Sequence, residues 1–297
     1  MPEAWICSGS SNPVLAKKLA QKLGTKLAEV HLDKFANGEA RVWVAEKKVP
    51  REAIILQSLS RPADEHLVEL MLLADALRRL GASEITAVVP WLGYSQQDKV
   101  FRSGEPLSVK VIAKMLQVVP LKRLITFDLH NQAILGFFEI PVTNLSARPL
   151  FVDFFKQDLS KDTLVVAPDE GAVKNSRVFA QELGVPVAYV DKKRDLVSGQ
   201  VTISGLSRSV KGKEILILDD VIVTGSTLLK VAGFLKTQGA ASIRVAATHY
   251  LDIPGTQAAL EKSAINTIAA TDTVAPPIKF PKLQILSVAD LLVQELS

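Results

Sequence analysis

Two adjacent carboxylates and a run of small hydroxyl residues form the most informative chemical segment of this 297-residue chain. The apolar run Ile215–Leu218 predicts a buried strand, and Asp219 and Asp220 follow at its carboxyl end, where open α/β sheets bind ligands. Small residues then lead into a helix predicted over 228–236, so their amides and hydroxyls can hold a phosphate. The aspartates instead suit vicinal hydroxyls or the water shell of a metal ion. The segment therefore predicts a sugar-phosphate site whose residues are Asp219, Asp220, Thr224, Gly225, Ser226 and Thr227.

The ordinary alternative for this segment is a capped helix that follows a strand with solvated aspartates. A second small-residue loop, at residues 8–13, precedes a helix predicted over 14–23 and could also hold an anion. Such loops are common in α/β proteins. The paired carboxylates beside the phosphate donors are therefore what favours the first segment.

Further charged side chains follow other predicted strands. Lys192 and Arg194 come just after the strand predicted at 187–190, and both can neutralise phosphate oxygens, with arginine adding a bidentate fork. His130 and Asp169 each stand in a loop after a strand, where a side chain can face a cleft. Taken alone, these residues also fit two exposed cations in a charged turn and a histidine that caps a helix or packs.

Short apolar runs alternate with amphipathic helices along the chain, which is typical of parallel α/β architecture. The clearest helix is predicted over 64–80, where apolar residues recur at three- and four-residue spacing. Residues 30–44 break the alternation and predict a hairpin with a turn at Asn37-Gly38. The predicted strands are Ala4–Ser8, Ala53–Gln57, Ile85–Val89, Arg123–Phe127, Leu164–Ala167, Val187–Val190, Ile215–Leu218 and Ile243–Ala247.

The two halves of the chain have a similar outline. Each half places an apolar strand before an exposed loop, at 87–93 in the first and at 164–171 in the second. We therefore expect an α/β protein of two similar domains, each a mainly parallel sheet flanked by helices, with a hairpin protruding from the first. We place the first domain at residues 1–143 and the second at 144–282.

Composition narrows the classes of partner. The net charge of +4 is spread along the chain and aromatic residues make up only 6%, which argues against nucleic-acid binding. No window approaches the roughly 18 uninterrupted apolar residues of a membrane span. The single cysteine, Cys7, cannot form an internal disulfide, which favours a reducing, cytoplasmic compartment.

Several segments, in one collinear order, resemble the ribose-phosphate diphosphokinase (phosphoribosyl-diphosphate synthetase) family. The loop at 219–227, taken alone, is shared with type I phosphoribosyltransferases. The other segments favour the first family, and they are Phe35–Glu39, Gly93–Lys99 with Arg102 and Glu105-Pro106, Asp128–His130 with Gly136–Phe138 and Pro141, Pro168–Gly171, and Asp191–Arg194.

The resemblance implies two phosphoribosyltransferase-like domains that transfer the diphosphoryl group of ATP to the C1 hydroxyl of ribose 5-phosphate, with Mg²⁺ as cofactor. It implies that Lys192 and Arg194 are catalytic and that His130 and Asp169 hold the metal. It also implies a homo-oligomer built from dimers, with a hexamer among the options, in which the hairpin serves the neighbouring subunit, and a C-terminal segment, 283–297, that returns to the first domain. The implied ATP-binding residues are Phe35, Asn37, Glu39, Gln96, Gln97, Asp98 and Arg102.

Several positions depart from the residues usual in this family, and three of them bear on the site. Gln96 stands where the family usually carries arginine, Val223 where it has aspartate or serine, and Glu170 where it often has histidine. The first change removes a phosphate-binding fork and the second removes a polar contact. Two alternatives therefore stay open at this point: a type I phosphoribosyltransferase, and a catalytically silent regulatory paralogue.

Overall fold

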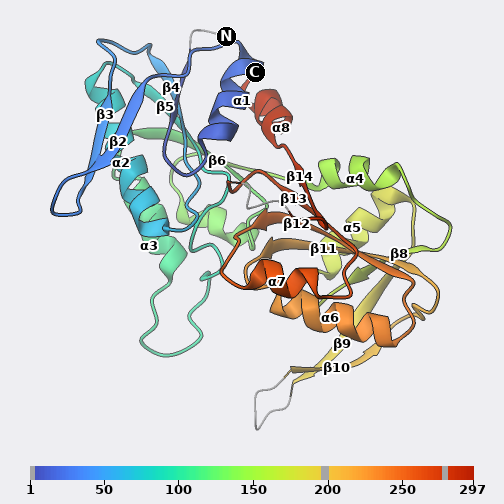
Figure 1. The fold of residues 1–297 in the computed structure, drawn as a ribbon. Helices are drawn as coiled ribbons and strands as arrows, with labels where there is room; N and C mark the ends of the chain where they lie inside the picture. The colour runs from blue at the N-terminus through green and yellow to red at the C-terminus, as the bar shows by residue number, and fades with distance from the viewer. Residues whose placement is uncertain (1–3, 195–200, 276–279) are drawn as a thin grey trace. The chain divides into compact units, whose positions relative to one another are not determined.

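Hydrogen-bonded parallel strands organise both halves of the molecule. The computed structural model describes residues 4–194, 201–275 and 280–297 (Figure 1). These residues divide into two units: the first runs to Ser146 and includes 272–275 and 287–297, and the second covers 147–271 and 280–286 apart from the gap at 195–200. None of the helices in these ranges is long and apolar enough to cross a membrane.

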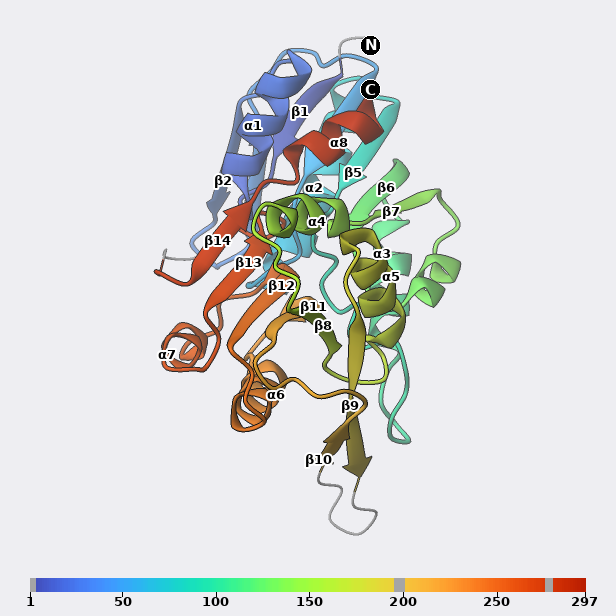
Figure 2. The same cartoon turned by 90° about the vertical axis from the view of Figure 1, so that its right-hand side faces the viewer.

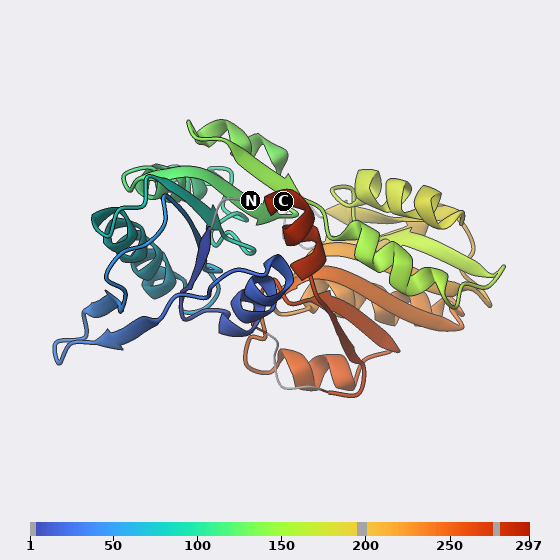
Figure 3. The ribbon, with the colours of Figure 1, turned by 90° about the horizontal axis from the view of Figure 1, so that it is seen from above.

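The sheet of the first unit is entirely parallel. Its order is β1-β4-β5-β6-β7, and α1 and α8 cover one face while α2 and α3 cover the other (Figures 1 and 3). The strands are β1 (Trp5–Ser8), β4 (Glu52–Leu56), β5 (Glu84–Val88), β6 (Leu121–Phe127) and β7 (Val142–Leu145). The helices are α1 (Pro13–Leu23), α2 (Ala63–Arg79), α3 (Ser108–Leu116), the 3₁₀ helix η1 (Gln132–Phe137) and α8 (Ala289–Leu296).

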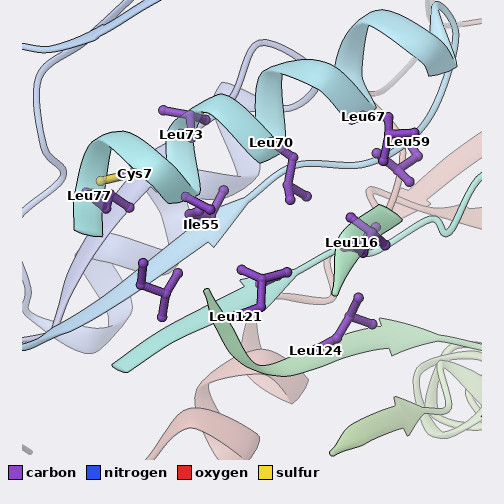
Figure 4. Close-up of a cluster of buried hydrophobic side chains, with 14 of the residues drawn as sticks. Cys7, Ile55, Leu59, Leu67, Leu70, Leu73, Leu77, Leu116, Leu121 and Leu124 are labelled. Atoms are coloured by element: carbon purple, nitrogen blue, oxygen red, sulfur yellow. The ribbon is translucent and has the colours of Figure 1, made fainter. Parts of the chain in front are cut away.

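The core of this unit forms where the apolar stripe of α2 meets the sheet. Leu67, Leu70 and Leu77 are buried on one face of the helix, as the spacing predicted, and they pack in one cluster with Ile55 and Leu124 (Figure 4). A fully buried leucine contributes about 1.5–3 kcal/mol relative to an exposed one. The stripe therefore fixes how α2 lies on the sheet.

A separate antiparallel hairpin, β2 (Val30–Lys34) and β3 (Ala40–Val44), projects from the first unit (Figure 3). Gly38 has φ 89°, a left-handed conformation that glycine adopts without steric cost, and its N–H donates to the Phe35 carbonyl at 2.8 Å. The predicted hairpin and its turn are confirmed.

The second unit has a larger sheet, with order β10-β9-β8-β11-β12-β13-β14. Every neighbouring pair is parallel except β9 and β10, so the sheet is mainly parallel as expected. Helices α4 and α5 lie on one face and α6 and α7 on the other (Figures 1 and 2). The elements are α4 (Arg148–Lys156), β8 (Thr163–Ala167), α5 (Val173–Leu183), β9 (Val187–Arg194), β10 (Val201–Leu206), β11 (Glu214–Ile222), α6 (Ser226–Thr237), β12 (Ser242–Tyr250), α7 (Thr256–Glu261), β13 (Thr267–Thr271) and β14 (Leu283–Leu286).

The structure corrects two of the expected domain limits. A boundary between residues 143 and 144 would cut through β7, which pairs with β6 up to Leu145, so the first unit ends at Ser146 instead. The expectation that all of 283–297 returns to the first domain is wrong for 283–286. Those residues form β14 and continue the backbone ladder of β13 in the second sheet, whereas 287–297 lie in the first unit.

Replacing Gly233 by alanine is expected to stabilise the protein. Gly233 lies inside α6, and a Cβ built there meets no heavy atom within 4 Å, so the change restricts the unfolded chain without creating a clash. We expect the free energy of unfolding in urea to rise by about 0.4–1 kcal/mol. Gly184→Ala is the matched control, since it also meets nothing within 4 Å but has φ 71°, and it should destabilise instead. A Gly233→Ala protein less stable than the wild type would contradict this account.

Candidate active site

The paired aspartates lie within a strand and not after it. Strand β11 continues through Asp219 and Asp220 to Ile222, because β12 pairs alongside it as far as the Ile222–Tyr250 register. The sequence prediction that the strand ends at Leu218 is therefore wrong. The extension still leaves both carboxylates at the carboxyl end of the sheet, half-buried, directly before the turn into α6.

The turn into α6 presents the start of a helix without a side-chain cap. Helix α6 begins at Ser226, two residues before the predicted start, and Gly225 precedes it with φ 69°. The N-cap residue Gly225 offers no side-chain cap, and the Ser226 amide makes only a long 3.4 Å hydrogen bond to the Thr224 hydroxyl oxygen. An anion at this helix start would replace that contact and accept from the first-turn amides. Thr224, Ser226 and Thr227 are exposed beside them.

The other small-residue loop is already occupied by the protein itself. The amide and hydroxyl of Ser10 both donate to the Glu69 carboxylate, at 2.9 and 2.8 Å, and the Ser11 amide donates to the side-chain carbonyl of Gln57. Asn12 caps α1 by accepting from the Leu15 amide. The donors of this loop that a phosphate would need are therefore already bonded to Glu69 and Gln57, and the Glu69 carboxylate would repel a phosphate. The loop at 8–13 is not a phosphate site.

A third carboxylate adds to the electrostatics of the paired aspartates. The pKa of Asp219 is raised well above its ordinary value, first by burial and then by the negative charge of Asp220, with Asp169 adding to it. Asp169 follows β8, which neighbours β11 in the sheet, and its carboxylate accepts from the Ala172 amide at 3.0 Å. The structure therefore brings Asp169 toward the two aspartates that the sequence singled out.

These carboxylates do not form a closed metal cage. Across the described residues, no group of three or more His, Cys, Asp or Glu side chains is arranged to hold a metal ion. A cation here would complete its shell with water or with ligand oxygens, which is the usual state of Mg²⁺ beside phosphates.

In the first unit, the predicted ATP loop is tied to the loop that carries His130. The Asp98 carboxylate accepts from the side-chain amide of Asn131 at 2.7 Å, one residue after His130. The Gln97 side-chain carbonyl accepts from the Ser108 hydroxyl at 2.7 Å. Gln96, Arg102 and His130 are exposed, with Gln96 and Arg102 on the same loop as Asp98.

The first turn of α2 holds both the ATP loop and the hairpin. The Tyr94 hydroxyl donates to the Asp64 carboxylate, and this bond raises the pKa of Tyr94. The neighbouring Glu65 pairs with Lys34, the residue before Phe35, at 2.7 Å. Asp64, Glu65 and Asn131 were not predicted from the sequence. Asp64 and Glu65 are ordinary residues for a first helical turn, and Asn131 is an ordinary cap of η1, so only the tertiary contacts show a second role.

The hairpin tip exposes an aromatic face. Phe35 is 51% exposed, and the guanidinium of Arg41 lies 5.7 Å from its ring centre. The Asn37 side chain accepts from the Glu39 amide at 3.2 Å and so shapes the turn, while both residues remain exposed. This tip can stack on a planar ring and offer it polar groups.

Lys192 and Arg194 belong to β9, which runs four residues beyond its predicted end. Their backbones pair with Ile203 and Val201 of β10 in antiparallel register. Their side chains, and the loop at 195–200 expected to close over the site, lie outside the described residues.

Comparisons with known proteins agree along the whole chain. Residues 4–119 match the model of the N-terminal domain of ribose phosphate pyrophosphokinase, and residues 145–278 match the phosphoribosyl transferase domain. The chain is 34% identical to a ribose-phosphate pyrophosphokinase of Helicobacter hepaticus, covering 97% of this chain and 93% of the relative, and 36% identical to one of Burkholderia pseudomallei, covering 98% and 93%. Its structure is similar to the crystal structure of phosphoribosylpyrophosphate synthetase from Mycobacterium smegmatis, with a TM-score of 0.91, 32% identity and coverage of 98% and 97%.

Proposed function

Because the chain belongs to the ribose-phosphate pyrophosphokinase family, it transfers the diphosphoryl group of ATP to ribose 5-phosphate, and we propose which residues carry this reaction. The products are 5-phosphoribosyl 1-diphosphate, used in nucleotide biosynthesis, and AMP. The observation that carries the assignment of residues is the uncapped start of α6 beside Asp219 and Asp220.

Ribose 5-phosphate is proposed to bind at the start of α6. Its phosphate would accept from the amides and hydroxyls of residues 224–227, where the helix dipole also favours negative charge. Asp219 and Asp220 would accept from the ribose hydroxyls. The sugar would thereby be held at both ends, with its C1 hydroxyl oriented for attack.

ATP is proposed to bind through residues of the first unit. The Phe35 ring would stack on adenine, with Asn37 and Glu39 supplying polar contacts to the nucleoside. The remaining proposed contacts, to the rest of the nucleotide, are Gln96, Gln97, Asp98 and Arg102. Gln96 carries no charge, so the cations of this loop are Lys99 and Arg102.

Transfer forms one bond and breaks another. The C1 hydroxyl oxygen attacks the β-phosphorus of ATP, the bond from that phosphorus to the oxygen shared with the α-phosphate breaks, and AMP leaves with the electron pair. The C1 hydroxyl releases its proton. Lys192 and Arg194 at the end of β9 would neutralise the charge that develops on the transferred group.

Mg²⁺ is the proposed cofactor, and His130 and Asp169 are the proposed protein ligands. The carboxylates near Asp219 fit a divalent cation, because burial and then the negative charges of Asp220 and Asp169 raise the pKa of Asp219. When bound, Mg²⁺ neutralises phosphate oxygens and orients them. Asp169 would offer its carboxylate from a position fixed by the Ala172 amide.

We also propose a cytoplasmic homo-oligomer, built from dimers, in which the hairpin completes a neighbouring subunit's site. The exposed Phe35 tip supports the oligomer, since its ring is available to a ligand bound elsewhere. The single, buried and free Cys7 supports a reducing compartment.

The proposed roles predict that the reaction yields AMP and that Lys192→Ala loses activity. With Mg²⁺, ATP and ribose 5-phosphate, the protein should form AMP and the diphosphorylated sugar in equal amounts. Phosphorus NMR measures both products. Lys192→Ala should lower kcat by about 100- to 1,000-fold at unchanged Tm, because it removes charge stabilisation of the transferred group.

Arg208→Ala removes an exposed cation just after β10 and is the control, with wild-type kcat expected. Formation of ADP in place of AMP would indicate ordinary phosphoryl transfer. No turnover in either the wild type or Lys192→Ala would favour a catalytically silent paralogue.

A further inference from the structure

The outer face of the β2–β3 hairpin carries a second set of aromatic and charged side chains. Side chains alternate along each strand, so His31 and Asp33 share one face, and the register sets Trp43 and Arg41 directly opposite them. Val30, Leu32, Val42 and Val44 lie on the other face and pack with the core. The outer face thus has no part in holding the hairpin to its unit.

These four side chains enclose a hollow between two cross-strand rows. The rings of His31 and Trp43 stack with centroids 4.8 Å apart and an interplanar angle of 19°. His31, Asp33, Arg41 and Trp43 together line a surface pocket. One wall is therefore aromatic, and the other presents a carboxylate beside a guanidinium.

The hollow is accessible and is held in shape. Trp43 is 57% exposed, and the imidazole Nε2 of His31 lies 3.2 Å from a Glu29 carboxylate oxygen. Arg41 reaches from this hollow toward the Phe35 ring, 5.7 Å away. An exposed indole stacked on an imidazole gives a broad flat surface that is unused by the fold.

The chemistry of the lining selects one class of ligand. A planar heteroaromatic base can stack against the Trp43–His31 pair, since stacking tolerates any base. The Arg41 guanidinium can donate two parallel hydrogen bonds to a phosphate, and Asp33 can accept from an exocyclic amine or a ribose hydroxyl. An apolar ligand would leave both charges unused, whereas a nucleotide uses all four side chains.

We propose that this face is a nucleotide-binding subsite for a purine nucleoside 5′-phosphate, distinct from the Phe35 tip at which ATP is placed. The inference goes beyond the proposed function, because the reaction needs only the nucleotide at Phe35. Arg41 links the two positions: a phosphate that draws Arg41 into the hollow takes it away from the Phe35 ring.

Equilibrium dialysis of the full chain with labelled AMP tests the subsite. Ribose 5-phosphate is kept saturating so that the phosphate donors at the start of α6 are occupied. The wild type should bind two AMP per chain, Trp43→Ala should bind one, and Arg41→Ala should bind the second at least tenfold more weakly. Phe35→Ala should lose only the other AMP.

Fluorescence gives an independent readout of the same subsite. In the Phe35→Ala protein, AMP should quench the exposed Trp43 with saturation, and the quenching should disappear in Phe35→Ala/Trp43→Phe. Arg51→Ala is the matched control and should change neither readout. Arg51 directly precedes β4, and its side chain is 77% exposed. Circular dichroism confirms that each variant keeps its fold.

The outcomes separate the alternatives. One AMP per chain in the wild type, or two that survive Trp43→Ala, overturns the subsite. Loss of both AMP molecules in Phe35→Ala also overturns it, because the hollow and the tip would then form a single site. AMP formation from ATP is measured separately, so a negative result here leaves the assignment of the reaction intact.

Discussion

Replacing Asp219 by asparagine is expected to lower kcat/KM about 100-fold or more while raising the melting temperature. Asparagine keeps the side-chain oxygen that accepts from the Asp220 amide at 3.0 Å, so the local backbone is preserved. It removes the negative charge that is proposed to accept from ribose hydroxyls. Two charge-assisted hydrogen bonds of about 1.5–3 kcal/mol each account for a loss of this size.

The stability gain follows from the direction of the pKa shift. Folding raises the pKa of Asp219, first because the carboxyl is buried and second because Asp220 is near. The folded state therefore holds its proton more tightly than the unfolded state, and stability falls as pH rises from the unfolded pKa toward the raised one. Above the raised pKa the wild type bears the full cost of ionising Asp219, and asparagine does not.

Calorimetry across pH checks this sign. The difference in Tm between Asp219→Asn and the wild type, both free of metal, should be close to zero near pH 4 and should grow as pH rises. A gain of about 1 kcal/mol corresponds to about 2–4 °C. A variant that is less stable at every pH would contradict the proposed electrostatic cost.

Asp162, a carboxylate whose pKa is shifted in the opposite direction, provides the control. Asp162 pairs with Lys213 at 2.7 Å, and this hydrogen bond holds its pKa below the ordinary value. At pH values above the unfolded pKa of Asp162, Asp162→Asn should therefore cause a small loss of stability. It should leave kcat unchanged. Full activity of Asp219→Asn, matching that control, would remove Asp219 from the sugar site.

Replacing Gly93 by alanine is expected to destabilise the first unit and weaken ATP binding together. A Cβ at Gly93 would lie 2.5 Å from the backbone carbonyl oxygen of Leu59 and 3.0 Å from its Cβ. Backbone atoms cannot rotate away, and Leu59 is itself held by a 2.9 Å bond from its N–H to the Trp91 carbonyl. The segment after Gly93 must move, and Gln96 and Gln97 follow closely along it.

The size of both effects can be estimated from packing. Inserting a carbon into a filled site costs about 1–3 kcal/mol, and misplacing a binding group by about 1 Å can cost about 100-fold in rate. We expect a lower urea midpoint and a raised KM for ATP, with the KM for ribose 5-phosphate little changed. Gly136→Ala is the control, because that glycine is exposed and its added Cβ meets nothing within 4 Å. Equal stability and equal KM in the two variants would refute the argument.

The sequence alone was sufficient for the α/β class, the hairpin and the strands with continuous apolar runs. Strands such as β4 and β8 are buried along almost their whole length, so residues 53–56 and 164–167 form continuous apolar runs. Strands β7, β10, β13 and β14 escaped prediction. Of these, β7 and β14 have only four residues each, and Thr143, Asn144 and Gln284 are polar. Such strands are specified by the neighbour that they pair with.

The candidate site divides in the same way. Residue types and order along the chain were enough to single out Asp219, Asp220 and the loop after them. The paired carboxylates favoured that loop over residues 8–13, but the sequence could not exclude residues 8–13, since both segments consist of small residues before a helix. The structure decides between them. Glu69, which is 59 positions from Ser10 in sequence, accepts from the amide and the hydroxyl of Ser10 in the loop at 8–13.

The extent of β11 and the position of Asp169 likewise depended on the tertiary structure. The strand runs through two aspartates because β12 pairs beside it to Tyr250, a fully buried residue. Asp169 raises the pKa of Asp219 because β8 and β11 are neighbours in the sheet, although 50 positions separate the two residues. Local sequence determines which groups are present and which elements form; backbone pairing between distant segments determines which of those groups meet.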